Sequence, residues 1–248
     1  MKKNNLEFYD ISADDWWNED AKIYNLYHLN KPRFEFFSRY ISNWQEIKAL
    51  DVGCGGGFSC EYMADLGVEV YGIDRSQKCI ETAINHANFS GFEISYCCGV
   101  AEKMPYPNDF FDVVVCVDVL EHVESVPCVV SEIFRILKPN GLFFFDTINR
   151  NFKSKLVMIW LMENILGEIP KGVHDWQKFI KPEEITEVLN KSGFDNITIK
   201  GFDIFSEALQ LNLVKYLQFK KTNTFVVDIN DDTSINYIGK ASKVTDTA

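Results

Sequence analysis

Residues 47–57 read Ile-Lys-Ala-Leu-Asp-Val-Gly-Cys-Gly-Gly-Gly, and this stretch decides the fold. The apolar residues before Asp51 predict a short strand, and the glycines after it predict a tight turn. Residues 58–66 then have the spacing of a helix. A strand that leads through a glycine turn into a helix is typical of a nucleotide-binding α/β unit, in which the ligand approaches the backbone at the turn.

Strands and helices continue to alternate after this unit. Strands are predicted at 68–74, 94–98, 111–117 and 142–148. Ser76 and Ser125 predict N-caps, one for a helix that runs to about Ser90 and one for a helix that ends at the turn Lys138-Pro139-Asn140-Gly141. This order predicts an α/β, Rossmann-like, doubly wound and mostly parallel sheet, whose ligands bind at the carboxyl ends of the strands.

A single domain is expected over 1–248, with additions at three places. Its expected parts are an N-terminal helical cap at 1–44, a cofactor-binding core at 45–149, a lid or insertion at 150–181 and a C-terminal part at 182–248. In the last part we expect a helix at 182–192, strands at 194–202, 224–228 and 235–239, and an extra helical insert near 205–221. The polar tail after Lys240 is expected to fray.

Charge and composition exclude some classes of protein. The chain has 25 Lys and Arg against 36 Asp and Glu, a net charge of −11, which argues against a nucleic-acid partner because phosphate binding needs clustered cations. The seven cysteines contain no C-x-x-C pair, so reduced thiols and a cytoplasmic location are expected. No apolar run approaches the roughly 20 residues of a membrane span.

A carboxylate at the end of the second predicted strand points to a ribose. Asp74 follows Gly53 by 21 residues, the spacing at which an acid accepts hydrogen bonds from ribose hydroxyls. A dinucleotide would need a third glycine at position 58, where this chain has Phe58. S-adenosylmethionine has a ribose but no pyrophosphate, and Asp51 could help to hold its ammonium group. The sequence therefore favours S-adenosylmethionine over a dinucleotide.

The motifs around this site resemble those of a known class. Leu50–Gly57, Gly72-Ile73-Asp74, Leu120-Glu121-His122-Val123 and Leu137–Gly141 resemble the motifs of class I S-adenosylmethionine-dependent methyltransferases. The resemblance implies the seven-stranded sheet of that class. Stretches outside these motifs, among them Trp16-Trp17-Asn18, Asn30–Arg33, Asn149-Arg150-Asn151 and Ile169–Pro182, are similar to the ubiquinone-biosynthesis O-methyltransferases, which methylate polyprenylated catechols.

This resemblance implies roles for several residues. Arg33, Gly53, Asp74 and Val117 would contact the cofactor by this resemblance. The strand and glycine turn themselves add Asp51, just before the turn, and Gly55 within it as expected cofactor contacts. The family pattern Glu-x-x-Glu-His appears here as Asp118-Val119-Leu120-Glu121-His122. In eukaryotic members this cluster is associated with a divalent metal such as Mg²⁺, which implies Asp118, Glu121 and His122 as ligands, although Asp118 departs from the pattern.

Two histidines are candidates for acid–base chemistry. His122, beside Glu121, follows the fourth predicted strand at the catalytic edge of the sheet, and His174 lies in the insertion. A structural role remains open for each of them: a hydrogen bond within the loop for His122 and a contact that stabilises the lid for His174.

The insertion itself differs in charge from the rest of the chain. It has six basic and three acidic residues around the apolar run Leu156–Met162. That combination suits either a membrane surface or a hydrophobic substrate channel, while an ordinary core helix remains the alternative.

Three functions remain open at this level. The first is O-methylation of a catechol or phenol, with a hydrophobic quinone precursor as the acceptor. The second is O- or N-methylation of another small molecule by the same fold, which the departure at 205–221 keeps open. The third is a non-catalytic module that binds S-adenosylmethionine, against which the presence of Asp51, Asp74, Glu121 and His122 argues.

Overall fold

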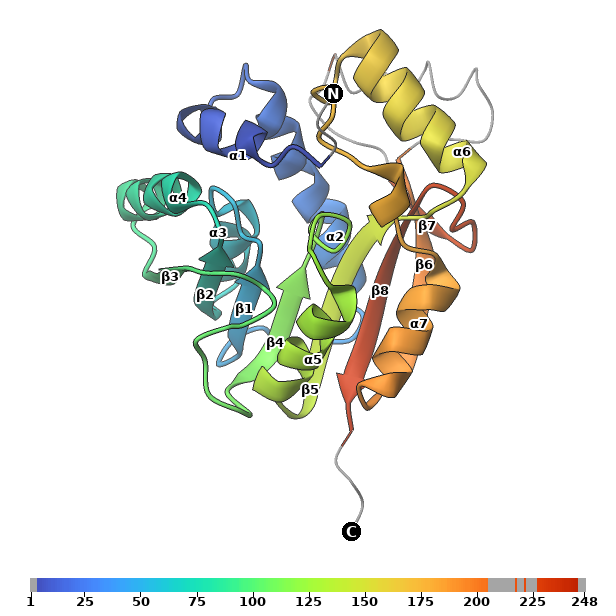
Figure 1. Cartoon of the computed structure of the whole chain (residues 1–248). Helices are drawn as coiled ribbons and strands as arrows, with labels where there is room; N and C mark the ends of the chain where they lie inside the picture. Colours follow the sequence, from blue (N-terminus) through green and yellow to red (C-terminus); the bar gives the residue numbers. More distant parts are fainter. Residues whose placement is uncertain (1–3, 205–216, 218–220, 222–226, 245–248) are drawn as a thin grey trace.

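The structure is a computed structural model that describes residues 4–204, 217, 221 and 227–244. A helical N-terminal segment comes first, with α1 (Glu7–Ile11), η1 (Ala13–Asp15), η2 (Lys22–Leu29) and α2 (Asn30–Phe37). In Figure 1, α1 lies above the ends of the strands and α2 lies behind the sheet, and a cap at 1–44 stays a prediction.

An eight-stranded sheet with the order β3-β2-β1-β4-β5-β8-β6-β7 forms the centre of the molecule. Its strands are β1 (Lys48–Val52), β2 (Glu69–Asp74), β3 (Ile94–Cys98), β4 (Phe111–Cys116), β5 (Leu137–Ile148), β6 (Phe194–Asp203), β7 (Asp228–Asn230) and β8 (Asn236–Lys243). The first five strands pair in parallel. The pairs β5–β8, β8–β6 and β6–β7 are antiparallel. The doubly wound prediction is confirmed. The resemblance implied a sheet of seven strands, whereas this sheet has eight, with the short strand β7 at its edge.

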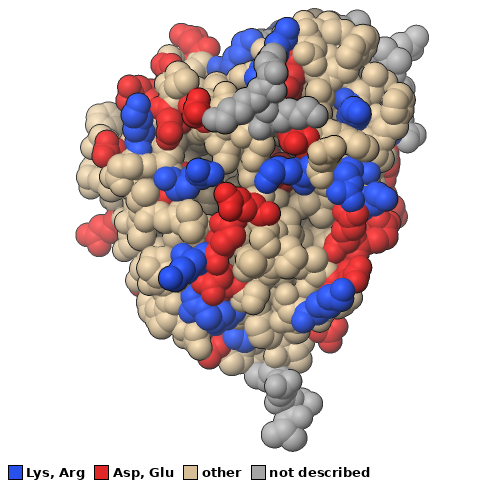
Figure 2. Space-filling view, in the orientation of Figure 1, with Lys and Arg blue, Asp and Glu red and all other residues tan. Residues whose placement is uncertain are grey.

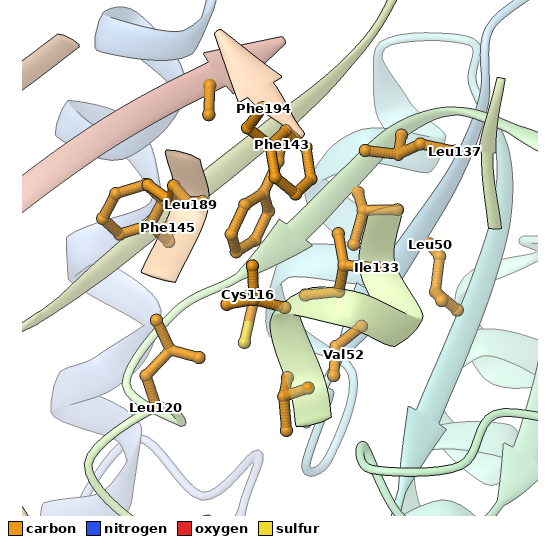
Figure 3. Packing of buried hydrophobic residues seen from close by; sticks show 14 of the residues in the cluster. Leu50, Val52, Cys116, Leu120, Ile133, Leu137, Phe143, Phe145, Leu189 and Phe194 are labelled. Atoms are coloured by element: carbon orange, nitrogen blue, oxygen red, sulfur yellow. The ribbon is translucent and has the colours of Figure 1, made fainter. Parts of the chain in front are cut away.

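Helices cover both faces of the sheet, and the strand sequences show why. Val113 and Val115 of β4 face one hydrophobic cluster, whereas Val114 and Cys116 face the other, because side chains alternate along a strand. The first cluster includes residues of α2, α3 (Phe58–Asp65) and α4 (Gln77–Ser90). The second includes residues of α5 (Val126–Ile136) and α7 (Pro182–Lys191). Figure 3 shows this second cluster, with Ile133 and Leu189 packed near Phe143 and Phe145.

The two predicted N-caps are confirmed. The hydroxyl of Ser76 accepts a hydrogen bond from the amide of Cys79 at the start of α4, and Ser125 does the same for Cys128 at the start of α5. The first residue of the strand that follows α5 was predicted too far along the chain. It begins at Leu137 rather than Leu142, because Leu137 already pairs with Phe111. Residues 138–141, where a turn was expected, lie within β5, and the pairing register shifts there.

The C-terminal part departs from the expectations at the end of β8. Strand β8 runs to Lys243, so the prediction of fraying immediately after Lys240 is wrong for these residues. The short strand β7 is Asp228–Asn230, and most of the strand expected at 224–228 falls outside the described residues. The extra helical insert expected near 205–221 falls almost wholly outside the described residues.

The insertion at 150–181 forms a helix above the sheet, at the edge where the parallel strands end (Figure 1). It comprises α6 (Phe152–Ser154), η3 (Lys155–Leu166), which has π-helical turns, and the short η4 (Trp176–Lys178). Met158 packs inward against Ile148, Phe179 and Ile235, whereas Trp160 is 57% exposed. The apolar run Leu156–Met162 is therefore divided between an inner and an outer face.

No helix among the described residues is long and apolar enough to cross a membrane. Among the coloured residues on the face shown in Figure 2, Lys and Arg side chains are interspersed with Asp and Glu. That face therefore offers no continuous basic track for a phosphate backbone.

Candidate active site

The glycine turn after β1 is shaped by positive backbone φ angles. Gly53, Gly55 and Gly57 have φ values of +74°, +51° and +94°, a region that L side chains rarely adopt. Space is also lacking, because an added Cβ would lie 2.3 Å from Val119 at Gly53 and 2.2 Å from Trp16 at Gly55. The turn leads into α3, whose first backbone N–H groups have no partner within the helix.

Asp74 lies beside this turn, at the end of β2. Its Oδ2 accepts a hydrogen bond from the amide of Gly55 at 2.9 Å, and its Oδ1 accepts one from the amide of Ser76 at 2.7 Å. Burial raises the pKa of this carboxyl group, although both amides favour the ionised form. The structure thus brings together the glycines and the acid that the sequence assigned to a ribose.

Asp51 is 2% exposed at the end of β1, and burial raises its pKa to about 7. The thiol of Cys60 contacts its Oδ2 at 3.5 Å. Val117 follows β4 at the same edge and packs against the cluster that contains α2 and α3. Both residues thus lie at the strand edge where the sequence placed the cofactor, and their contacts with it remain predictions.

Arg33 is not a solvated surface charge. It is 2% exposed, its Nε donates to Asp146 at 2.5 Å, and its Nη2 donates to Asp118. Asp146 also accepts a hydrogen bond from the amide of Asp118 at 2.8 Å. Arg33 therefore ties α2 to the ends of β4 and β5, and it fixes the loop that carries Glu121 and His122.

Glu121, His122 and His174 form a second group at this edge. One ligand-type atom from each residue lies within 4.8 Å of the others, and the two imidazole rings stack with centroids 5.4 Å apart. Each side chain has a further partner: Thr147 donates to Glu121 at 2.8 Å, Asn4 lies 2.9 Å from Nδ1 of His122, and Glu163 lies 2.9 Å from Nδ1 of His174. All three predicted catalytic residues are thus brought together.

Burial sets the protonation of two members of this group. Desolvation raises the pKa of Glu121 to about 8, and the charge of Asp118 adds to this effect. Desolvation lowers the pKa of His122 to about 3, helped by His174 and Lys178. Near neutral pH, Glu121 is therefore largely a neutral acid and His122 a neutral imidazole.

The predicted magnesium ligands are not assembled as a set. Asp118 is paired with Arg33, and the atoms that converge with Glu121 are imidazole nitrogens. Magnesium prefers oxygen ligands, and Glu121 would first have to lose its proton. The residues present do not fit Mg²⁺, and we derive no step through it.

Comparison with known proteins shows the family to which the chain belongs. A sequence model of a methyltransferase domain matches residues 50–145. The ubiquinone biosynthesis O-methyltransferase of Idiomarina loihiensis is 36% identical over 230 residues, which are 91% of this chain and 87% of that protein. The enzyme of the same name from Rickettsia canadensis is 35% identical and covers 88% of this chain and 97% of its own length. The chain belongs to the ubiquinone biosynthesis O-methyltransferase family.

Solved structures agree with this family at the level of the fold. Magnesium protoporphyrin IX methyltransferase from Synechocystis, solved with bound S-adenosylhomocysteine, superposes with a TM-score of 0.65 at 16% identity and covers 97% of this chain and 95% of its own. A protein from Pyrococcus horikoshii gives 0.65 at 19% identity, with 96% and 98% covered. This member of the ubiquinone biosynthesis O-methyltransferase family is an S-adenosylmethionine-dependent methyltransferase.

Sequence reasoning missed four residues of this family member's site. Asp146 and Thr147 lie near the end of β5, and a polar pair in an otherwise apolar strand was a signal that could have found them. Asn4 and Glu163 gave no such signal, because their contacts with His122 and His174 depend on how distant segments fold together.

Proposed function

We propose that this enzyme transfers the methyl group of S-adenosylmethionine to a hydroxyl group of a polyprenylated catechol in ubiquinone biosynthesis. The observation that carries the proposal is the proximity of two groups at one sheet edge. Asp74 and the glycine turn would bind the ribose of the cofactor. The side chains of Glu121, His122 and His174 converge beside this site, where one of them can accept the proton of the acceptor hydroxyl. The names of the relatives point to the same reaction.

The reaction needs alignment and the removal of one proton. The sulfonium already makes the methyl group electrophilic, so alignment of the acceptor oxygen with the methyl–sulfur bond can supply roughly 7–11 kcal/mol. A phenol with a pKa of about 10 is mostly protonated near pH 7, and a neighbouring base therefore raises the fraction of reactive phenolate.

Each residue of the site has a place in this reaction. Asp74 holds the ribose, Gly53 and Gly55 allow the cofactor to approach the backbone, and Asp51 holds its ammonium group. Val117 forms a wall for the adenine. Arg33 contributes by fixing Asp118 and the loop that leads to Glu121.

The insertion would receive a hydrophobic phenolic acceptor and contact a membrane surface. Apolar side chains four residues apart are exposed along its helix: Phe152 is 78%, Leu156 is 44% and Trp160 is 57% exposed. The segment also carries six basic and three acidic residues in a chain whose net charge is −11. An amphipathic helix with basic flanks lies in a membrane interface, where its apolar face is removed from water.

The test is a labelled-methyl assay on demethylated quinone precursors, preceded by titration calorimetry with S-adenosylmethionine. We expect binding of the cofactor and transfer to a catechol oxygen, together with rescue of a bacterial mutant that lacks quinone O-methylation. Binding without transfer to any acceptor would favour a non-catalytic module. Transfer to amines but not to catechols would favour N-methylation. Absence of binding would end the cofactor assignment.

A further inference from the structure

A buried acid in the insertion is not explained by packing. Glu163 lies in η3 and is 2% exposed, although its helix otherwise presents mostly apolar residues to its neighbours. A buried carboxylate is costly unless it is hydrogen-bonded. Its Oε2 accepts from the amide of Gly172 at 2.9 Å, and its Oε1 accepts from the amide of His174 at 3.2 Å.

The same oxygen, Oε1, lies 2.9 Å from Nδ1 of His174. A carboxylate can only accept a hydrogen bond, so this contact places the imidazole proton on Nδ1. The other nitrogen, Nε2, then keeps its lone pair and can take up a proton. Glu163 therefore selects the tautomer of His174 and also holds the orientation of its ring.

The surroundings of His174 leave it as the available base. Glu121 and His122 face it from the loop after β4, Glu163 faces it from η3, and Asp175 and Lys178 lie on its own segment. Nδ1 of His122 faces the amide oxygen of Asn4, and Glu121 accepts a hydrogen bond from Thr147, whereas Nδ1 of His174 faces the carboxylate of Glu163. The His174 side chain is 10% exposed, so protons can still reach solvent from it.

We propose that Glu163 is a positioning residue that holds His174 as the base for the acceptor hydroxyl. This inference rests on the proposed O-methylation. The O–H bond of the acceptor breaks and its proton goes to Nε2 of His174. The oxygen forms a bond to the methyl carbon while the carbon–sulfur bond breaks, and its electron pair stays on the sulfur of S-adenosylhomocysteine. His174 then releases the proton to solvent.

The first test compares Glu163→Gln with the unchanged full chain. An amide can donate to Nδ1 and stabilise the wrong tautomer, so we expect kcat on a catechol to fall by about 10²–10⁴-fold, the usual range for loss of general-base assistance. The affinity for S-adenosylmethionine should stay unchanged. Glu187→Gln, which removes an exposed acid paired with Lys191 in α7, is the matched control and should leave both quantities unchanged.

A nitro-substituted catechol separates a base from a structural support. Its hydroxyl is ionised near neutral pH and needs no base. The fall in kcat caused by Glu163→Gln should therefore be at least about tenfold smaller with this acceptor than with the ordinary catechol. For the same reason, the variant should recover activity on the ordinary catechol as the pH rises. An equal loss on both acceptors, or an unchanged kcat, would overturn the role of Glu163.

A second readout does not need turnover. The chain has only four histidines, so nitrogen NMR spectra can be assigned by comparison with His174→Gln. We expect the Nδ1-protonated form of His174 in the unchanged enzyme and its loss in Glu163→Gln. A His174 protonated at Nε2 in the unchanged enzyme would overturn the proposal even if no acceptor had been found. Failure of the unchanged enzyme to methylate any catechol would instead count against the proposed function.

Discussion

Two backbone amides fix the carboxylate of Asp74 in one orientation. The bonds from Gly55 and Ser76 use one lone pair on each oxygen, which leaves the remaining lone pairs for hydroxyl donors. Because Gly55 belongs to the glycine turn, the ribose acid and the turn form one rigid unit. A ligand that binds to Asp74 therefore meets the turn in a defined position.

Removal of this carboxylate should weaken cofactor binding selectively. Hydrogen bonds to a charged group contribute about 1.5–3 kcal/mol, so Asp74→Ala should raise the dissociation constant of S-adenosylmethionine by about 10–100-fold in titration calorimetry. Glu69→Ala, on the exposed part of the same strand, serves as the control and should leave the constant unchanged. An unaltered affinity in a folded Asp74→Ala variant would contradict the ribose assignment.

The residues that the sequence could predict are those whose partners are near in the chain. Gly53, Gly55 and Asp74 follow from a strand, a turn and the next strand, which pair locally in parallel. Arg33 required the resemblance to a family, because its partners lie 85 and 113 residues away. The residues next to Glu163 in the sequence do not indicate that it is buried. Its hydrogen-bond partners, Gly172 and His174, lie further along the chain and reach it only in the folded protein.

At the scale of elements, the helix of the insertion has two different faces. Met158 packs against Phe179 and Ile148, so its replacement by serine would disturb the core beneath the helix. Phe152, Leu156 and Trp160 are exposed and can be changed without such damage. The apolar run indicated an amphipathic role, but only the folded helix shows which members face outward.

A triple replacement of these exposed residues by serine tests membrane contact. We expect the unchanged enzyme to co-sediment with vesicles of phosphatidylcholine and phosphatidylglycerol, and the variant to lose about tenfold or more of this affinity, because burial of each large apolar side chain contributes up to about 1.5–3 kcal/mol.

The control variant replaces three other exposed apolar residues, Ile11, Phe89 and Val100, by serine. It should bind vesicles like the unchanged enzyme. If both triple variants bind equally well, the insertion is not the membrane contact.

At the scale of the whole molecule, the sequence predicted the order of the strands in the sheet well, but it misplaced the first or last residue of some strands. Long apolar strands have a strong periodic signal, and five of them pair in parallel as expected. The early start of β5 and the extension of β8 depend on pairing partners instead, because Leu137 and Lys243 have ladder positions opposite Phe111 and Phe194. Local propensity cannot reveal such partners.

Buried acids make the stability of the whole molecule depend on pH. Glu121, Asp51 and Asp146 have pKa values raised to about 8, 7 and 7, chiefly by burial. A carboxyl group whose pKa is higher in the folded than in the unfolded state binds more protons when folded. Its contribution to stability is therefore complete below its ordinary pKa and is lost as the pH rises through the folded value.

Glu121→Gln should remove part of this dependence. We expect the cofactor-free variant to gain thermal stability over the unchanged enzyme at about pH 8.5, and to show little gain at about pH 4.5, where Glu121 is protonated when folded. Scanning calorimetry across this range measures the difference. Glu183→Gln, at an exposed site in α7, should show no such trend. A gain of equal size at both pH values would contradict the raised pKa of Glu121.

Hydrogen bonds join the N-terminal segment to the insertion: the amide of Asn5 donates to the carbonyl of Gly172 at 2.9 Å, and Nζ of Lys22 donates to the carbonyl of Gly167. Asn4 contacts His122 from the same place, and its amide donates to the His122 carbonyl at 3.0 Å. Neither the N-terminal segment nor the insertion can move away from the site without breaking these hydrogen bonds. When a ligand binds to one of these two segments, we therefore expect amide hydrogen exchange to slow in both of them. Hydrogen-exchange measurements on the insertion and on the first described residues, with and without the ligand, check this.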